Sequence, residues 1–430
     1  MSRTMKESGI PWIGEIPSHW RLFQTSTLFH EHKEKNNGLK EKNLLSLSYG
    51  QIKRKDINSS EGLLPQSFET YNIIDKGDIV FRLTDLQNDK RSLRTGLCKE
   101  RGIITSAYVS VRANTEIDSR FFHYLYHSYD ICKVFYGLGD GVRQGMNYDD
   151  LKKLLVFLPP ILEQQAIADF LDKKCEEIDE MVLLQEKIVE ELKAYKQSII
   201  NESVCKGLNP DVPMKDSGIE WVDSIPRHWE VKKVKYLANA LMKGNGITKE
   251  EVFKNGDTPC VRYGEIYSKY NNSFQTCLSA TNIAIQPNPL FFTKGDILCA
   301  GTGELVEEIG KSIVYMGEER CLAGGDIIVI NHNQNPVFLN YALNSNYAQT
   351  QKSKGKAKLK VVHISAAEIG SVLIALPPLE EQQTIADYLD KKCGGIDTLI
   401  SVRQSKIDAL KEYKKSIIYE YITGKKEVNG

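Results

Sequence analysis

Two long segments of the chain carry the hydrophobic periodicity of paired helices. In the first segment, seam positions recur every seven residues, at Leu171, Ile178, Gln185, Leu192 and Ile199. In the second segment, the corresponding positions are Leu389, Ile396, Arg403, Leu410 and Ile417. A heptad pattern that persists over four repeats is typical of a coiled coil. We therefore predict two long helices, each reaching roughly 60 Å, that pair antiparallel with each other within the chain.

Further seam positions are expected three residues after each of these. They are Lys174, Met181, Ile188 and Tyr195 in the first segment, and Lys392, Leu399, Lys406 and Tyr413 in the second. Gln185, Arg403 and Lys406 place polar groups near the middle of the pair. Such groups either fix the register as buried residues or lie at the exposed edge of a loose seam, and both interpretations stay open.

Proline and glycine mark the expected limits of the helices. Pro159-Pro160 and Pro377-Pro378 precede the periodic segments, and proline is tolerated only before or within a first helical turn. Gly394-Gly395 in the second segment stands where the first has Glu176-Glu177. Because each glycine costs a helix about 1 kcal/mol, we expect a kink or a break there.

Outside these segments, apolar residues form short runs bounded by turn residues, which predict strands. In residues 1–157 the runs are LLSLSYG, GDIVFRL, GIITSAYVSVRA and LLVFLPP, and Phe121 to Val134 is expected to form a short buried helix. In residues 214–375 the runs are PCVRYGEI, GDILCAG, DIIVINH and SVLIALPP, with a helix-like VFLNYALNS segment. The pattern predicts two mixed α/β (α+β) domains.

The chain also repeats itself. Residues 158–200 match residues 376–418 without a gap, and 23 of the 43 paired positions are identical. MKESGIPWIGEIPSHW near the N-terminus returns as MKDSGIEWVDSIPRHW from Met214. Between these matched ends only short segments agree, such as Ser48–Ile52 with Arg262–Ile266. We infer two copies of one unit whose surfaces have diverged.

This pseudo-two-fold repeat predicts six consecutive parts. They are a first globular domain (1–157), a first helical segment (158–206), a linker (207–213), a second globular domain (214–375), a second helical segment (376–424) and a tail (425–430).

Charge is unevenly distributed along the chain. The 56 basic and 56 acidic residues cancel overall, but residues 1–157 hold 23 basic and 19 acidic residues and residues 214–375 hold 18 and 16. Residues 158–206 hold 6 basic and 11 acidic residues. A polyanion meets local charge, so DNA binding by the two mildly basic domains stays open. Acid on the first helix indicates a surface that faces a partner or solvent, or simply improves helix solubility.

Other features exclude several protein classes. No apolar run approaches the roughly 20 residues that cross a bilayer, and the N-terminus lacks the apolar core of a signal peptide. We therefore expect a cytoplasmic protein with no membrane partner. Nine cysteines without a CxxC pair, and histidines without metal-ligand spacing, favour neither a disulfide framework nor a metal site. Cys175 and Cys393 are repeat mates and are expected to be packing residues.

Three repeated motifs carry a family resemblance. The IPxHW motif opens each domain, LPPxxEQQxIADxLD opens each helix and LKxYKxSII closes it. Together they resemble the specificity (S) subunits of type I restriction–modification systems over essentially the whole chain. The resemblance implies a protein that reads double-stranded DNA through two target recognition domains, one for each half of a split, asymmetric site, with the helices setting the spacing between halves.

The same resemblance implies partners and an absence of catalysis. The helices would dock methyltransferase (M) subunits, two of them, and restriction/translocase (R) subunits would join the complex. S-adenosylmethionine, ATP and Mg would be bound by those partners, whereas this chain would bind no cofactor or metal and would have no catalytic residues.

Catalytic motifs fail independently of the resemblance. Asn288-Pro289-Leu290-Phe291 lacks the second proline of an amino-methyltransferase motif, and Gly310-Lys311-Ser312 lacks the leading glycine of a phosphate loop. Asp78 and Asp296 are expected to cap turns. A methyltransferase or nuclease is therefore disfavoured. The remaining alternative is an orphan DNA-binding scaffold or regulator that acts without modification or restriction partners.

DNA recognition needs basic residues for phosphates and planar or bidentate groups for base edges. In the first domain the candidates are Tyr49, Arg82, Arg91, Arg94, Arg143 and Gln144. In the second domain they are Arg262, Tyr263, Thr302, Lys352, Lys354, Lys356, Lys358 and Lys360. The five lysines alternate, so in an extended segment they would share one face and follow the DNA backbone. The competing interpretations are a solvated lysine loop and tyrosines that pack in turns.

Overall fold

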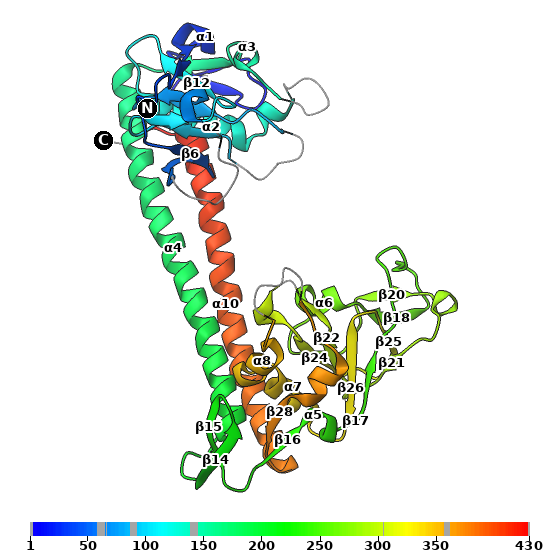
Figure 1. Cartoon of the computed structure of the whole chain (residues 1–430). Helices are drawn as coiled ribbons and strands as arrows, with labels where there is room; N and C mark the ends of the chain where they lie inside the picture. The colour runs from blue at the N-terminus through cyan, green and yellow to red at the C-terminus, as the bar shows by residue number, and fades with distance from the viewer. Residues whose placement is uncertain are drawn as a thin grey trace. The chain divides into compact units, whose positions relative to one another are not determined.

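The computed structural model describes residues 3–57, 65, 67–86, 93–137, 145–303, 305–356 and 362–428. The chain divides into two units, each with one globular domain and a stretch of both long helices (Figure 1). Unit 1 consists of Met1–Glu186 with Ser405–Gly430, and unit 2 of Lys187–Gln404. Among the described residues, no helix is both long and apolar enough to cross a membrane.

The globular domain of unit 1 is built on antiparallel strands. Its four-stranded sheet has the order β10 (Thr95–Leu97), β9 (Ile79–Phe81), β12 (Val109–Ala113), β4 (Phe29–Glu31). Its three-stranded sheet has the order β11 (Gly102–Ile104), β8 (Asn72–Ile74), β5 (Glu34–Lys35). The strand pairs are β1 (Met5–Glu7) with β2 (Glu15–Pro17), β3 (Arg21–Gln24) with β13 (Leu155–Leu158), and β6 (Leu45–Ser48) with β7 (Gln51–Arg54). The helices are α1 (Thr25–Leu28), η1 (Phe68–Thr70), α2 (Ser119–Ile131), η2 (Val134–Gly137) and α3 (Tyr148–Leu151).

Aromatic packing forms the core of this domain. Helix α2 buries Phe122 and Tyr126 against the four-stranded sheet. The Tyr126 ring lies 5.0 Å from the ring of Phe81, and the Phe122 ring lies 5.2 Å from that of Phe29, both edge to face. Edge-to-face aromatic pairs add to the stabilisation from apolar burial. The short buried helix that the sequence predicts over 121–134 is confirmed, with bounds of 119–131.

The globular domain of unit 2 has a larger mixed sheet. Its five strands have the order β17 (Ala238–Lys243), β26 (Ile327–His332), β22 (Ile297–Ala300), β24 (Ser312–Tyr315), β19 (Ser273–Phe274). A second sheet has the order β20 (Ser279–Thr281), β18 (Thr258–Val261), β25 (Cys321–Ala323), β21 (Phe291–Phe292). The strand pairs are β14 (Met214–Ile219) with β15 (Val222–Pro226), β16 (Glu230–Lys233) with β28 (Leu373–Leu376), and β23 (Thr302–Gly303) with β27 (Val362–His363). The helices are α5 (Val234–Leu237), α6 (Tyr263–Ser268), η3 (Ile283–Ile285), η4 (Val306–Glu308), α7 (Pro336–Leu343), α8 (Asn346–Ser353) and α9 (Ala366–Ser371).

Most predicted strands are confirmed, with two corrections. GIITSAYVSVRA forms two strands, β11 and β12, because a turn at Thr105–Tyr108 separates them. PCVRYGEI is a strand only as far as Val261, because α6 begins at Tyr263 and the Glu265 carboxylate caps that turn. The segments around Tyr49 and Tyr263 therefore match in sequence but differ in structure, since Tyr49 lies in the turn of the β6–β7 hairpin.

The two long helices are α4 (Ile161–Lys206) and α10 (Leu379–Ile422), and they run antiparallel. In unit 1, the Lys414 amine lies 2.7 Å from the Asp179 carboxylate, and Lys411 lies 3.1 Å from Glu186. In unit 2, Lys196 pairs with Asp397 at 2.7 Å. The predicted mixed α/β fold with two long antiparallel helices is confirmed.

The first series of seam residues is buried or partly buried. Gln185 is only 6% exposed, and Arg403 is partly buried. The second series of expected seam residues lies one position before the residues that are buried. Its members include Met181 (42% exposed), Tyr195 (59%), Leu399 (49%) and Tyr413 (55%). The buried positions lie four residues after the first series, at Cys175, Val182 and Val189 in α4 and at Cys393 and Ile407 in α10. Lys406 is accordingly exposed beside Ile407.

The expected break at Gly394-Gly395 is wrong. Helix α10 continues through both glycines. A Cβ atom at either position would meet nothing within 4 Å, so close packing does not require glycine there. The buried seam residues Cys393 and Ile396 flank the pair, and their burial offsets the modest cost of two glycines.

Repeated polar contacts explain why the motif that opens each helix is matched so well. Gln164 accepts from Asp118 N at 3.0 Å and donates to Pro159 O at 2.8 Å. Its repeat mate Gln382 accepts from Asn335 N at 2.9 Å and donates to Pro377 O at 2.9 Å. Asp118 and Asn335 are the N-caps of α2 and α7. Each glutamine thus ties a domain to the start of a long helix.

A second repeated contact lies about two turns further along each helix. The Tyr124 hydroxyl donates to Asp172 at 2.8 Å in unit 1, and Tyr341 donates to Asp390 at 2.8 Å in unit 2. Part of the acid on α4 therefore holds the adjacent domain and does not face solvent alone. The Asp172 side chain is also 45% exposed, so this contact adds a structural role to those that the sequence suggests for it.

The IPxHW motifs meet the ends of the helices. Trp20 and Trp229 are fully buried. In unit 1, a Cβ at Gly424, just after α10, would lie 2.9 Å from the Trp20 ring. In unit 2, a Cβ at Gly207, just after α4, would lie 3.2 Å from the Trp229 ring. Both glycines have positive φ, so each helix ends in a turn that favours glycine and that packs on a tryptophan.

Candidate nucleic-acid interface

The candidate residues of unit 1 gather around the end of strand β9. Tyr49 is 78% exposed at the tip of the β6–β7 hairpin, where it and Gly50 have positive φ, as in a type I′ turn. A Cβ at Gly50 would lie 3.1 Å from the Leu93 Cβ, so the hairpin tip is close to the segment that precedes β10. Arg82 follows β9 directly, and its backbone N–H donates to Arg94 O at 2.8 Å.

Arg94 itself is wrongly predicted as a base-contacting residue. Its side chain is fully buried. The guanidinium donates to the carbonyl oxygens of Arg82, Thr84 and Asp85 at 3.2, 2.8 and 3.1 Å, and to the Tyr136 hydroxyl at 3.2 Å. The sequence shows an arginine in a hydrophilic stretch but not the carbonyl groups that surround it. Arg94 therefore shapes the 82–85 loop and does not reach DNA.

Three candidates of unit 1, Arg91, Arg143 and Gln144, lie outside the described residues. The described residue that follows 138–144 is Gly145, and Met146 N donates to Leu83 O at 2.9 Å. Met146 thus lies beside the 82–85 loop. Unit 2 repeats this arrangement, because Ile364 N donates to Gly301 O at 2.8 Å after segment 357–361. Lys358 and Lys360 belong to that segment and also lie outside the described residues.

The candidate residues of unit 2 gather at the end of β22. Thr302 begins β23 and its hydroxyl lies 3.0 Å from His363 Nδ1. Gly301 N donates to Asp326 O at 2.6 Å, and a Cβ at Gly301 would lie 3.0 Å from that oxygen. The Lys243 ammonium, 2.9 Å from the Asp326 carboxylate, lowers the pKa of that group. Sequence reasoning missed three residues of this surface, namely Lys243, Asp326 and His363. The sequence signal nearby is the glycine of two short segments, 244–246 and 324–325.

Arg262 and Tyr263 line a pocket in the same region. Its volume is about 320 Å³, and its other lining residues are Gly246, Ile247, Thr248, Gly264, Gly325 and Asp326. Asp326 connects this pocket to Thr302. Its backbone oxygen accepts from Gly301 N, and its carboxylate forms hydrogen bonds with Lys243 and Thr302. Three of the candidates of unit 2, Arg262, Tyr263 and Thr302, are therefore close to one surface.

The predicted row of lysines is wrong in its first member. Lys352 belongs to helix α8 and not to an extended segment, so the alternation does not place it on one face with Lys354 and Lys356. Its side chain is buried, and its Nζ donates to Gly310 O at 2.8 Å. Burial lowers the pKa of this amine to about 8. Lys354 is exposed and pairs with Glu220 at 3.0 Å, whereas Lys356 pairs with Glu368 at 2.7 Å.

Carboxylates near the sheets have structural partners. Asp78 and Asp296 cap the turns before β9 and β22 as predicted, accepting from Asp75 N at 2.8 Å and Thr293 N at 2.7 Å. Asp75, Asp78 and His32 lie close enough together to suggest an ion site. However, Arg112 pairs with both carboxylates at 2.7 Å. The hydrogen bonds that Arg112 donates to Asp78 raise the pKa of the guanidinium, so an arginine holds this group of carboxylates.

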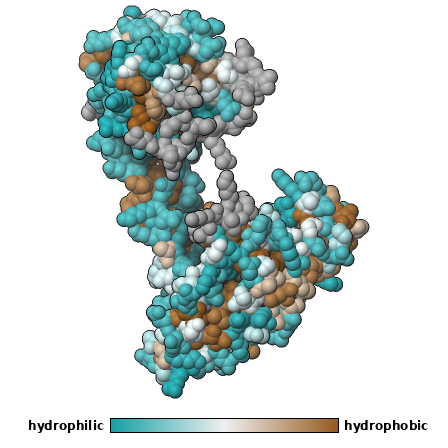
Figure 2. Space-filling view, in the orientation of Figure 1, coloured by the Kyte–Doolittle hydropathy of each residue, from teal (hydrophilic) through white to brown (hydrophobic). Residues whose placement is uncertain are grey.

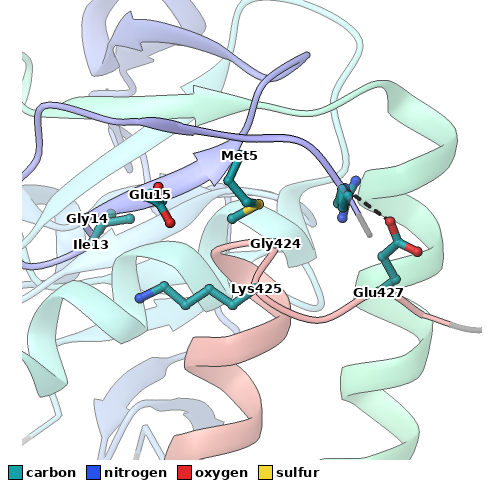
Figure 3. Close-up of a pocket in the computed structure, with 8 residues that line it drawn as sticks. Met5, Ile13, Gly14, Glu15, Gly424, Lys425 and Glu427 are labelled. Carbon is teal, nitrogen blue, oxygen red and sulfur yellow. Dashed lines mark ion pairs between the residues drawn. The ribbon is translucent and has the colours of Figure 1, made fainter. Parts of the chain in front are cut away.

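One further pocket, of about 630 Å³, lies in unit 1 where the two ends of the chain meet (Figure 3). It is lined by Arg3, Met5, Ile13, Gly14, Glu15, Gly424, Lys425 and Glu427. Arg3 pairs with Glu427 at 3.4 Å, shown as a dashed line in Figure 3, and also with Glu163 of α4. The charged groups at this pocket thus hold the N-terminal segment against α4 and against the segment that follows α10.

Comparison with known proteins finds a matching domain family and similar sequences. Residues 226–412 match the family model for the type I restriction modification DNA specificity domain. The chain is 24% identical over 436 aligned residues to the specificity subunit assigned to the type I restriction enzyme MjaX of Methanocaldococcus jannaschii, covering 96% of this chain and 95% of that subunit. It is 25% identical to the MjaVIII specificity subunit of the same organism, covering 76% of this chain and 75% of that one.

A solved structure shares the fold. A chain from a study of complex assembly and conformational transition of the type I R-M system aligns with a TM-score of 0.69 at 17% identity, covering 95% of this chain and 98% of that one. Residues 226–412 thus match a type I DNA specificity domain, and along nearly its whole length the chain is similar to the specificity subunits of type I restriction enzymes.

Proposed function

We propose that this chain reads a bipartite, asymmetric site on double-stranded DNA, with one half-site for each globular domain. The proposal rests on one observation: the candidate surfaces occupy equivalent locations in the two globular domains. In both domains they lie where an inner strand of the main sheet ends, at β9 and β22, beside Met146 in unit 1 and Ile364 in unit 2. The residues at these locations differ between the domains, so two unlike half-sites are expected.

The side chains at these surfaces suit DNA. Tyr49 and Arg82 in unit 1, and Arg262, Tyr263 and Lys243 in unit 2, provide cations and planar groups at or near the surface. Arginine and tyrosine recognise base edges and sugar–phosphate groups through hydrogen bonds and stacking. Candidates that lie outside the described residues, namely Arg91, Arg143, Gln144, Lys358 and Lys360, remain proposals for the same surfaces.

The long helices would dock the methyltransferase subunits. Large apolar residues are exposed along them, and hydrophobic patches are visible on the helical part of Figure 2. On α4 they are Leu162, Met181, Leu183, Leu184 and Tyr195, and on α10 they are Leu379, Leu399, Val402 and Tyr413. Solvent-exposed apolar clusters on a helix pair mark a surface for a protein partner. Restriction subunits would join the complex through those partners.

We assign the chemistry of the complex to the partners. S-adenosylmethionine, ATP and Mg would be bound by the methyltransferase and restriction subunits, and this chain would act only in recognition. The failed methyltransferase and phosphate-loop motifs at Asn288–Phe291 and Gly310–Ser312 support this division. The orphan regulator remains the alternative, in which the same DNA surfaces would act without partners.

Co-purification tests the proposal and the alternative together. The chain is expressed with the methyltransferase subunit of its own locus, and the purified material is assayed for methyl transfer to DNA. We expect a stable complex that methylates DNA, and no methylation by the chain alone. Methylation by the chain alone would refute the non-catalytic role, and the absence of a complex would favour the orphan regulator. A variant with Leu183 and Leu184 both changed to Asp tests the docking surface.

A further inference from the structure

Arg262 carries a buried hydrogen-bond donor, its Nε, without an acceptor in the part of the chain that the structure describes. The arginines that form ion pairs with carboxylates include Arg3, Arg54, Arg101, Arg112 and Arg120. In the pocket that Arg262 lines, the one carboxylate is that of Asp326, which pairs with Lys243 at 2.9 Å. Because a buried donor without an acceptor is costly, this guanidinium is suited to a ligand that supplies acceptors.

The backbone at Arg262 is held in place by a buried carboxylate. Arg262 N donates to Glu265 Oε2 at 3.0 Å. Glu265 is 2% exposed, and its Oε1 accepts from Lys269 Nζ at 2.7 Å and from the Ser279 hydroxyl. The backbone that carries the Arg262 side chain is therefore fixed, so less conformational freedom is lost when this side chain binds a ligand.

Glycines keep the space around Arg262 open. A Cβ at Gly324 would lie 3.3 Å from the Arg262 Cα, and a Cβ at Gly325 would lie 2.8 Å from the Gly246 Cα. Side chains at these positions would therefore displace the arginine or the facing turn. The resulting pocket of about 320 Å³ is bounded by backbone, by Thr248 and by Tyr263. An open pocket with one arginine held at its wall suits a flat ligand edge that carries acceptors.

We propose that Arg262 recognises a guanine in the half-site that unit 2 reads, an inference that rests on the function proposed above. A guanidinium fork donates two hydrogen bonds to O6 and N7 of guanine in the major groove, and no other base presents that pair of acceptors there. The specificity of this half-site then depends on Arg262, whereas neighbouring cations such as Lys243 contribute affinity.

Selection from a randomised pool of DNA duplexes tests this assignment. The full-length chain, purified with the subunits that accompany it, is compared with Arg262→Gln, Arg262→Lys and Arg320→Gln. Arg320 is a matched control, because it is an exposed arginine of unit 2 that lies over the Phe291 ring and does not line the pocket. Circular dichroism establishes that each variant is folded, and if Arg262→Gln is not, Arg262→Lys decides the outcome.

The wild type and Arg320→Gln should select a guanine at one position of one half-site. Arg262→Gln should lose roughly 5- to 150-fold of the preference for guanine at that position, with all other positions unchanged. Arg262→Lys should retain total DNA affinity but lose most of that preference, because lysine lacks the planar fork.

Two results would overturn the assignment while leaving the proposed function intact. One is an unchanged guanine preference in both Arg262 variants. The other is equal weakening for all sequences, which would identify a phosphate contact instead. If the wild type itself selects no common sequence, the proposed function fails, and the assignment of Arg262 fails with it.

Discussion

At the scale of single residues, Arg94 determines the shape of the surface that carries Arg82. Replacing Arg94 with Met removes hydrogen bonds to three backbone carbonyls within a fully buried site. Leaving buried polar groups unpaired is strongly destabilising. We predict a loss of about 3 kcal/mol in the free energy of unfolding, measured by urea denaturation. Arg54→Met is the control, because Arg54 pairs with Glu100 on the exposed surface; equal effects of the two substitutions would contradict the structural role of Arg94.

Lys352 predicts a pH dependence of stability. Its folded-state pKa is about 8, lowered by burial from 10.5. Between about pH 8 and pH 10.5 the unfolded chain binds more protons at this residue than the folded chain, so stability rises with pH across that window. The gain should reach about 3 kcal/mol relative to pH 7.

The measurement compares the wild type with Lys352→Met in urea at pH 7, 8.5 and 9.5. The difference in unfolding free energy between the two proteins should shift in favour of the wild type as pH increases. Subtracting the variant removes contributions from other titrating groups. A difference that stays constant over this pH range would show that the amine is not buried in its charged form at neutral pH.

At the scale of elements, the helix seam makes a sharp prediction at two adjacent residues. Ile407 is 1% exposed and Lys406 is exposed. Ile407→Ala should lower the free energy of unfolding by about 2 to 4 kcal/mol, because it leaves a cavity in the seam. Lys406→Ala should leave the denaturation midpoint unchanged. If Lys406→Ala is destabilising in thermal or urea denaturation and Ile407→Ala is not, Lys406 is the buried seam residue, as the sequence predicts.

The heptad pattern predicted the helices and one series of seam residues, but not the second series. Positions three and four residues after a seam position both lie near the helix interface. Met181 beside Val182 and Leu399 beside Ile400 are apolar at both positions, so hydrophobicity alone does not choose between them. A signal was present nevertheless: Cys175, Val182 and Val189 are all apolar, whereas the alternative series includes Lys174.

Other errors arose where tertiary contacts decide the local structure. Tyr49-Gly50 and Tyr263-Gly264 are similar in sequence, but one pair closes a hairpin and the other starts a helix because the Glu265 carboxylate caps it. Arg94 and Lys352 lie in hydrophilic stretches, yet both side chains are buried. Each donates to a backbone carbonyl elsewhere in the chain, Arg94 to Thr84 O and Lys352 to Gly310 O. Neither the acceptor of a buried cation nor the capping partner of a turn is visible in a local pattern.

At the scale of the whole molecule, the ends of the chain complete the internal repeat. In unit 2 the chain runs without interruption from Gly207, which packs on Trp229, into the second domain. In unit 1 the equivalent Gly424 packs on Trp20, but the chain ends shortly afterwards, and Arg3 pairs with Glu427 across the gap. The N- and C-terminal segments of unit 1 thus occupy the positions that the 207–213 linker connects in unit 2.

A circularly permuted chain should therefore fold. In this variant a flexible linker joins the natural termini, and new termini are opened between Asn209 and Pro210, where the residues are exposed. We expect unchanged circular dichroism and the same selected DNA sequence as the natural chain. A control carries the same linker inserted at that position without a break. Loss of folding in the permuted chain alone would contradict the equivalence of the two junctions.

The central claim is that two unlike domains read two halves of one site. It is tested most directly by sequencing the methylated DNA of cells that carry this chain with its partner subunits, before and after residues 214–375 are replaced by the second domain of another specificity subunit. We predict a non-palindromic motif with two specified blocks separated by a fixed gap, of which the replacement changes only one block. A single continuous motif, or a change in both blocks, would contradict the account.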